Sequence, residues 1–282
     1  MIVVFGATGK VGRHVVSGLV ANDTPVRVFV RDPDAARFDP GVEVAEGNLD
    51  NAASIQAALA GAESVFLLTA GPDSLAHDLA VAGAADRHGR LHLVKVSSVA
   101  ANHPARGSYG EAHVKAESAS RQAAARWTIL RPAAFASNTL EWIWTVKSEG
   151  RVYQPYGKIP QAVIDPADVA AVAVAALLDP HRHSGHIYPV TGPAALTARE
   201  RAAILAAELN RPIEFVDASP ESAKAAMVGF GLPASYVDGV LAAQSDPEPT
   251  RGGIPLPTVR EITGNEPKSF VDWLRPHLVD YS

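Results

Sequence analysis

Cysteine is absent from the 282 residues of the sequence, and its absence excludes disulfides, thiolate metal sites and a cysteine nucleophile. Long apolar runs are also missing. The longest, Val169 to Leu178, has ten residues, whereas a membrane-spanning helix needs about 20. The N-terminal segment has no basic leader and no secretory pattern. We therefore expect a cytoplasmic protein that does not enter the membrane.

An excess of positive charge is missing too. Lys and Arg number 25 against 30 Asp and Glu, which gives a formal net charge of −5. Proteins that bind nucleic acids neutralise phosphates with a basic patch, and no run of basic residues occurs here. We therefore expect a small-molecule partner, with neither nucleic acid nor membrane contacts. The chain could act as a monomer or a homodimer.

The first 130 residues alternate between short β-branched runs and Ala-rich stretches with helical spacing. This alternation is typical of βαβ units and a parallel sheet. Several runs are continuously apolar, which indicates strands covered on both faces. Strands are expected at Ile2–Phe5, Val26–Val30, Val42–Ala45, Ser64–Leu68, Leu91–Val96 and Trp127–Leu130, and helices at Lys10–Ala21, Asn51–Ala60, Ser74–Arg87 and Ser108–Ala125. The predicted fold is α/β, a doubly wound (Rossmann) parallel sheet in three αβα layers.

The pattern continues through a helix opened by Asp165 and a strand at Ile187–Val190, and then becomes mostly helical. Later helices are expected at Thr197–Leu209, Pro220–Phe230, Pro233–Ala243 and Pro267–Leu274, with one short strand at Ile213–Val216. We therefore divide the chain into a dinucleotide-binding domain, residues 1–190, and a smaller C-terminal substrate lobe, residues 191–282. Residues 133–165 are expected to contribute to the substrate pocket.

A glycine-rich turn lies between the first predicted strand and the first helix. In Gly6-Ala7-Thr8-Gly9-Lys10-Val11-Gly12, Gly6 permits a tight turn, Gly9 lets a pyrophosphate approach, and Gly12 lets the helix pack on the sheet. The helix N-terminus offers free N–H groups to phosphates. The turn therefore predicts a dinucleotide site formed by Gly6, Thr8, Gly9, Lys10, Val11 and Gly12.

The residue at the tip of the second strand predicts which dinucleotide binds. An NAD enzyme usually has an acidic residue there, whereas Arg31 would face the 2′-phosphate of NADP, with Lys10 as a second positive charge. A shift of one residue would instead offer Asp32 to the ribose, and a solvated Arg31 is the alternative interpretation. We predict NADP(H). Further cofactor contacts are expected after the third and fourth strands, at Asn48, Leu49, Thr69 and Ala70.

Several motifs together resemble those of one protein family. They are the glycine turn, Arg31, Ser97-Ser98, Ile129-Leu130-Arg131-Pro132, Asp165-x-x-Asp168-Val169-Ala170 and Thr263-Gly264-Asn265-Glu266-Pro267. They resemble the NmrA-like group of atypical short-chain dehydrogenase/reductases, above all its bacterial quinone, azo and carbonyl reductases. The resemblance implies an NADPH-dependent oxidoreductase with Ser97 and Pro132 among its cofactor contacts. The group also includes catalytically silent redox sensors.

Short-chain reductases generally use a Ser, a Tyr and a Lys, the last two four residues apart on one helix face. The Lys lowers the pKa of the Tyr, and the Tyr protonates the carbonyl oxygen. The resemblance assigns Ser98 and Tyr109 to these roles, but His113 stands where the family has Lys. His113 could assist Tyr109 or act as the acid itself. Alternatively, Tyr109 is an exposed loop residue and His113 only touches substrate or water.

Aromatic residues concentrate after the sixth strand, although the chain is only 6% aromatic. Such a cluster is typical of a pocket for a flat substrate, or of ordinary packing under the lobe. The candidate substrate contacts are Phe135, Trp142, Trp144 and Tyr156, with Met227, Phe230 and Tyr236 as an opposite wall. Near His183, a group of histidines lacks a carboxylate or cysteine to complete a ligand set, so we expect no metal.

The leading hypothesis is an NADPH-dependent ketone or quinone reductase. It would transfer hydride to a quinone, an azo compound or a carbonyl of an aromatic or polyketide-like molecule. The alternative is a non-catalytic, NADP(H)-sensing regulatory protein of the NmrA type, favoured if Tyr109 and His113 face away from the nicotinamide. Epimerase or isomerase chemistry ranks third, because it normally requires the full Tyr and Lys pair.

Overall fold

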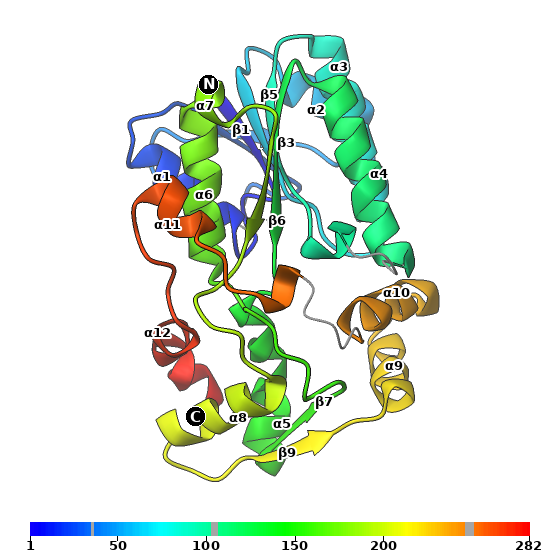
Figure 1. Cartoon of the computed structure of the whole chain (residues 1–282). Helices are drawn as coiled ribbons and strands as arrows, with labels where there is room; N and C mark the ends of the chain where they lie inside the picture. Colours follow the sequence, from blue (N-terminus) through cyan, green and yellow to red (C-terminus); the bar gives the residue numbers. More distant parts are fainter. Residues whose placement is uncertain (35–36, 103–106, 246–250) are drawn as a thin grey trace.

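A seven-stranded sheet forms the centre of the computed structural model, which describes residues 1–34, 37–102, 107–245 and 251–282 (Figure 1). The strand order is β3-β2-β1-β4-β5-β6-β8, and every neighbouring pair is parallel. The strands are β1 (Ile2–Phe5), β2 (Val26–Val30), β3 (Glu43–Glu46), β4 (Ser64–Leu67), β5 (His92–Val96), β6 (Arg126–Pro132) and β8 (His186–Val190). This order confirms the predicted doubly wound α/β fold.

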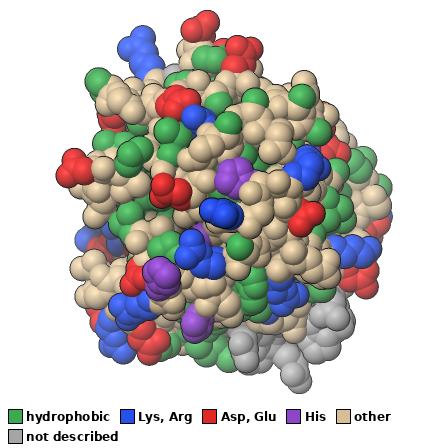
Figure 2. All heavy atoms as spheres, turned by 90° about the horizontal axis from the view of Figure 1, so that it is seen from above, with side chains coloured by type: hydrophobic (Ala, Val, Ile, Leu, Met, Phe, Trp, Pro, Cys, Tyr) green, Lys and Arg blue, Asp and Glu red, His purple; other side chains and the backbone are tan. Residues whose placement is uncertain are grey.

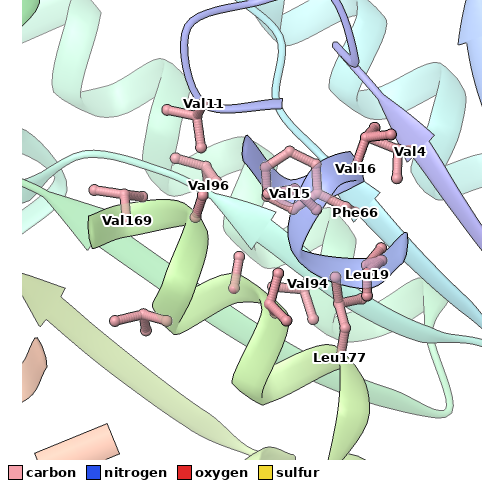
Figure 3. Close-up of a cluster of buried hydrophobic side chains, with 14 of the residues drawn as sticks. Val4, Val11, Val15, Val16, Leu19, Phe66, Val94, Val96, Val169 and Leu177 are labelled. Atoms are coloured by element: carbon pink, nitrogen blue, oxygen red, sulfur yellow. The ribbon is translucent and has the colours of Figure 1, made fainter. Parts of the chain in front are cut away.

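Helices cover both faces of the sheet and complete the three predicted layers. On one face lie α1 (Gly12–Val20), α6 (Pro166–Leu178) and α11 (Thr258–Thr263), and α2 (Ala52–Ala58), α3 (Ser74–His88) and α4 (Gly107–Ala123) lie on the other. Short α7 (Pro180–His183) links α6 to β8. Side chains such as Val15, Phe66 and Leu177 interlock in the core of the first face (Figure 3). Burying each contributes about 1.5–3 kcal/mol, which is why continuous apolar strands are stable here.

A smaller lobe lies at the carboxyl ends of the strands (Figure 1). Its core joins Trp142, Val152, Leu205 and Trp273. Strand order reverses between β1 and β4, the place where open α/β sheets bind ligands. The lobe elements are η2 (Ala136–Trp142), α5 (Ile143–Glu149), β7 (Arg151–Gln154), α8 (Ala198–Glu208), β9 (Glu214–Asp217), α9 (Pro220–Gly229), α10 (Ala234–Gln244), α12 (Phe270–Leu274) and η4 (Arg275–Tyr281), with η1 (Val99–Asn102) and η3 (Arg251–Gly253) beside them.

Two details of the lobe differ from the prediction. The expected strand near Ile213 is present as β9, but its parallel partner β7 was not predicted, because β7 is short and only tertiary pairing reveals it. The last helix begins at Phe270 rather than Pro267, since the Ser269 side chain caps it by accepting from the Asp272 amide. The helix predicted at Thr197–Leu209 is present as α8, and a capping box formed by Thr197 and Glu200 starts it.

The division of the chain at residue 190 stays a prediction. Although α11 follows residue 190, it packs against α6 and β8 of the sheet domain. Conversely, η2, α5 and β7 precede residue 190 and pack in the lobe core. The chain therefore crosses between the two cores more than once.

The surface seen from above in Figure 1 lies at the amino ends of the strands and carries charges of both signs. Among the described residues of this face, basic, acidic and histidine side chains are interspersed (Figure 2). Within the described ranges, no helix combines the length and the apolar character required to cross a bilayer.

Candidate functional site

The glycine turn joins β1 to α1 at the carboxyl edge of the sheet. Gly6 has φ +82°, and a Cβ on it would lie 2.4 Å from the Leu68 carbonyl oxygen. A Cβ on Gly12 would lie 2.0 Å from the Gly6 carbonyl oxygen. Thr8, Gly9 and Lys10 are exposed above these contacts. The turn therefore needs glycine for its backbone conformation, and it leaves residues 8–10 accessible to a ligand.

The start of α1 fits the phosphates of a dinucleotide. No side chain caps this helix, and its first turn carries no acidic residue. Val11 as a whole is 1% exposed and packs in the core, so its side chain is not available to a ligand. Uncapped N–H groups and the positive end of the helix dipole bind anions.

The remaining predicted cofactor contacts lie around this turn. Arg31 is exposed just beyond β2, where the 2′-phosphate of NADP is expected. Lys10 turns the other way, since its Nζ donates to the Ser137 carbonyl at 3.1 Å. The Asn48 side chain accepts from the Asp50 amide, and the Thr69 hydroxyl donates to Asp78 at 2.8 Å. Leu49 is half-buried, and Ala70 is exposed after β4.

Replacing Arg31 by alanine is expected to weaken NADPH binding by about 10- to 100-fold, the value of a charge-assisted hydrogen bond, while NADH binding stays unchanged. Fluorescence titration with both cofactors measures this. Arg90→Ala is the control. Arg90 is exposed and lies just before β5, at the amino end of the sheet, so its replacement should alter neither affinity. Equal affinities of the unmodified protein for NADPH and NADH would contradict the assignment.

A cavity of about 430 Å³ lies where β5 and β6 end and the lobe begins. Ser97 and Ser98 follow β5, and Pro132 ends β6. Tyr109 reaches the cavity from α4. Of the predicted site residues, the cavity brings together Ser97, Ser98, Tyr109, Pro132, Phe135 and Trp142.

Tyr109 and His113 share one face of α4, and their rings meet edge to face with centroids 4.7 Å apart. Tyr109 is partly buried on a helix rather than exposed in a loop. Burial is the main cause that raises the pKa of Tyr109 to about 12, and the neighbouring Tyr236 adds to it. A hydrogen bond with Ser98 acts in the opposite direction and lowers this pKa. Burial, and then Lys95 and Arg131, lowers the pKa of His113 to about 3. At neutral pH both groups are therefore uncharged.

His113 does not line the main cavity. It lines an adjoining cavity of about 340 Å³, whose wall also includes Tyr109 and Asp78. Tyr109 thus separates His113 from the cavity that contains Ser98. Of these two side chains, only Tyr109 reaches the main cavity, and His113 is a neighbour that can act through it.

A buried ion pair behind these residues escaped the sequence reasoning. Lys95 on β5 is 1% exposed, and its Nζ lies 3.0 Å from an Asp78 carboxylate oxygen on α3. Its ammonium also donates to the Val96 carbonyl. A signal was present, since Lys95 is a charged residue in a strand whose other residues, apart from His92, are apolar. This cation is one cause of the low pKa of His113.

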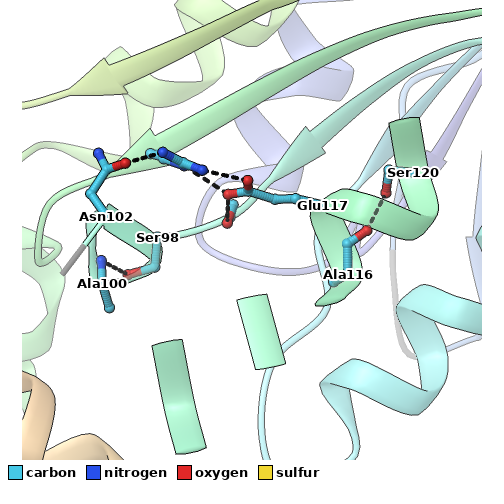
Figure 4. A network of polar contacts seen from close by, with 8 residues as sticks. Ser98, Ala100, Asn102, Ala116, Glu117 and Ser120 are labelled. Carbon is cyan, nitrogen blue, oxygen red and sulfur yellow. Dashed lines mark hydrogen bonds and ion pairs between the residues drawn. The ribbon is translucent and has the colours of Figure 1, made fainter. Parts of the chain in front are cut away.

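A second polar network anchors α4 to the ends of β5 and β6 (Figure 4). Glu117 is fully buried and receives hydrogen bonds from Arg131 Nε at 2.7 Å, Arg131 Nη2 at 2.5 Å and Ser97 Oγ at 2.6 Å. Arg131 also donates to the Asn102 side chain. Because Tyr109, His113 and Glu117 follow each other at intervals of four, this anchor fixes the helix face that reaches the cavity.

Two of the predicted substrate contacts lie away from this cavity. Trp142 lines the cavity, but Trp144 is 70% exposed on the outer face of α5, because two residues along a helix turn by about 200°. Tyr156 lies in the turn after β7 with φ +56° and does not line the cavity formed by the described residues. Met227 and Tyr236 do line it, whereas Phe230 is 89% exposed.

Polar side chains from the lobe complete the cavity wall, and sequence reasoning missed them. They are Asn138, Glu141, Gln154, Gln161 and Arg201. They come from separate elements whose packing no sequence pattern reveals. In the part of the chain that the structure describes, no group of three or more metal-binding side chains is suitably placed to hold a metal ion.

Comparison with known proteins supports the nucleotide site. A family model described as NAD(P)H-binding matches residues 6–180. The (4-alkanoyl-5-oxo-2,5-dihydrofuran-3-yl)methyl phosphate reductase of Streptomyces griseus is 39% identical over 279 residues, 98% of each chain. The NAD(P)H azoreductase of Xenophilus azovorans is 34% identical over 286 residues, 100% of this chain and 99% of the azoreductase.

Solved structures share the fold. The NADPH-dependent quinone oxidoreductase of Escherichia coli, complexed with NADPH, has a TM-score of 0.83 and 24% identity, covering 99% of this chain and 100% of its own. The negative transcriptional regulator NmrA, in complex with NADP, has a TM-score of 0.74 and 19% identity, covering 97% of this chain and 94% of its own. The fold is thus shared by a reductase and a regulator.

Proposed function

Because this chain belongs to the NAD(P)H-binding family, we propose that it is an NADPH-dependent reductase of conjugated, electron-poor small molecules, such as quinones and aromatic or polyketide-like carbonyl compounds. One observation carries the proposal: the cavity at the carboxyl edge of the sheet presents Ser98 and Tyr109 together. When bound on the glycine turn, the cofactor supplies hydride. The two hydroxyl groups then offer hydrogen bonds to the acceptor oxygen of a substrate.

The protonation of Tyr109 favours conjugated acceptors. With a pKa of about 12 and a neutral His113 beside it, Tyr109 holds its proton tightly and is a weak acid. Reduction of a quinone or an enone leaves charge on a delocalised oxygen, which is a weaker base than the alkoxide formed from an isolated ketone. Such a product needs a hydrogen bond more than a full proton transfer. The names of the relatives, an oxo-dihydrofuran reductase and an azoreductase, also support unsaturated acceptors.

NADPH oxidation with a panel of acceptors tests the proposal. We expect turnover with 1,4-naphthoquinone and a conjugated enone, and little with cyclohexanone. Tyr109→Phe should lower kcat about 100-fold, within the range for a positioned proton or hydrogen-bond donor. His113→Ala should lower it less. Tyr153→Phe, which removes a half-exposed hydroxyl on β7, is the control. Wild-type turnover in both the Tyr109 and the His113 variant would refute these roles.

A second candidate is a redox-sensing regulator of the NmrA type. The neutral His113 in place of a lysine favours it, because the usual proton relay is incomplete. The same panel discriminates between the candidates. Tight NADPH binding without turnover of any acceptor would favour the sensor.

A further inference from the structure

Arg201 is an arginine buried in the wall of the main cavity. It lies in the first turn of α8 and is 4% exposed. Its Nη2 donates to Gln161 Oε1 at 3.2 Å, and its guanidinium carbon lies 5.7 Å from the centroid of the Trp142 ring. Its Nε has no hydrogen-bond partner among the described residues. The guanidinium thus has donor capacity that the described part of the protein leaves unused.

No carboxylate compensates this charge within the ranges that the structure describes, where every ion pair involves other residues. Burial alone lowers the pKa of Arg201 to about 10, so the group stays protonated at neutral pH. Glu141 lines the same cavity. Burial raises the pKa of Glu141, and the positive charge that opposes this shift is that of Lys10, not that of Arg201. A buried cation without a carboxylate partner is costly. Arg131, by contrast, has such a partner in Glu117.

Two amide side chains extend the donor surface around Arg201. Gln161 Oε1 already accepts from Arg201, and Gln154 Oε1 accepts from Trp142 Nε1 at 3.1 Å. Both oxygens are therefore engaged, which leaves the amide NH₂ groups to donate. Gln154, Gln161 and Arg201 all line the cavity. A guanidinium fork with neighbouring N–H donors is the arrangement that binds phosphate and carboxylate oxygens.

We propose that Arg201, with Gln154 and Gln161, binds an anionic oxygen group of the substrate, a phosphoryl or a carboxylate group. Resting on the reductase function proposed above, this makes the substrate an electron-poor acceptor with an anionic substituent. Ser98 and Tyr109 lie on the sheet side of the cavity and Arg201 on the lobe side. An anion held by the lobe would orient the acceptor toward the two hydroxyl groups.

Calorimetry with the full chain and saturating NADP⁺ tests the site without turnover. The probes are phenyl phosphate, benzoate and the neutral benzamide. We expect one or both anions to bind, and Arg201→Met to weaken that binding about 10- to 100-fold while benzamide binding is unchanged. Arg201→Lys should restore part of the affinity. Arg199→Met is the matched control, because Arg199 is two positions away on α8, 52% exposed, and pairs with Asp217.

Thermal unfolding separates binding from a purely structural role. Because the charge has no carboxylate partner, Arg201→Met should leave the melting temperature unchanged or raise it. The proposal is overturned if neither anion binds the unmodified protein. It is also overturned if the Arg201→Met variant binds the anions as tightly as the unmodified protein does, whether or not the variant loses stability. A protein that binds the anions through Arg201 but reduces no acceptor would refute the reductase function alone. The stronger of the two anions identifies the group.

Discussion

Gly12→Ala is expected to weaken NADPH binding by about 100-fold or more and to destabilise the start of α1. The added Cβ would lie 2.0 Å from the Gly6 carbonyl oxygen and 2.9 Å from the Ala7 Cα, both backbone atoms that cannot rotate away. This steric clash can be relieved only if α1 moves away from the glycine turn. Overpacking of well-packed sites typically costs about 1–3 kcal/mol, and a clash with backbone falls at the upper end. Affinity should then fall by about 100-fold or more, because the helix N-terminus no longer faces the phosphates.

Gly83→Ala is the matched control for this substitution. Gly83 lies inside α3, and a Cβ there would meet only the end of the Arg87 side chain, at 3.8 Å. Alanine should therefore stabilise this helix by roughly 0.5–1 kcal/mol and leave NADPH binding unchanged. Fluorescence titration and thermal unfolding of both variants measure the two effects. Wild-type NADPH affinity in Gly12→Ala would show that the turn does not hold the cofactor.

The cofactor half of the protein was predictable because its signals are local. The turn at Gly6 and the apolar strands each depend on neighbours within a few residues, and the structure has them where the sequence placed them. Parallel strands then bring their carboxyl ends to one edge without further information. Tyr109 and Ser98 meet for this reason.

The substrate half was less predictable because its contacts are long-range. Trp142 and Trp144 differ by two positions, yet only the first lines the cavity. That distinction requires knowing which face of the consecutive helices η2 and α5 packs in the lobe core. Arg201 occurs in an unremarkable helical stretch and becomes notable only once α8 buries it beside Gln161. Lys95 was visible as a charge in a mostly apolar strand, but its partner Asp78 comes from a different element.

Glu117→Ala is expected to destabilise the protein by about 3–5 kcal/mol, the cost of breaking a buried ion pair by removing one partner. Glu117 has no exposed surface, and its loss leaves the Arg131 guanidinium, 12% exposed, without its carboxylate and Ser97 Oγ without its acceptor. Chemical denaturation measures the change. Glu214→Ala is the control: it breaks the Arg151–Glu214 pair, whose side chains are 47% and 61% exposed, and should cost at most about 1 kcal/mol.

A double substitution distinguishes a lost charge pair from a lost side chain. Glu117→Leu combined with Arg131→Met removes both charges and keeps apolar volume, so it should be more stable than Glu117→Leu alone. The single variants should also lower turnover, because Glu117 anchors the face of α4 that carries Tyr109 and His113. If Glu117→Ala were as stable as the Glu214→Ala control, the network in Figure 4 would not hold α4 to the sheet. The position of Tyr109 would then have to depend on its packing against Tyr236, at a centroid distance of 6.2 Å.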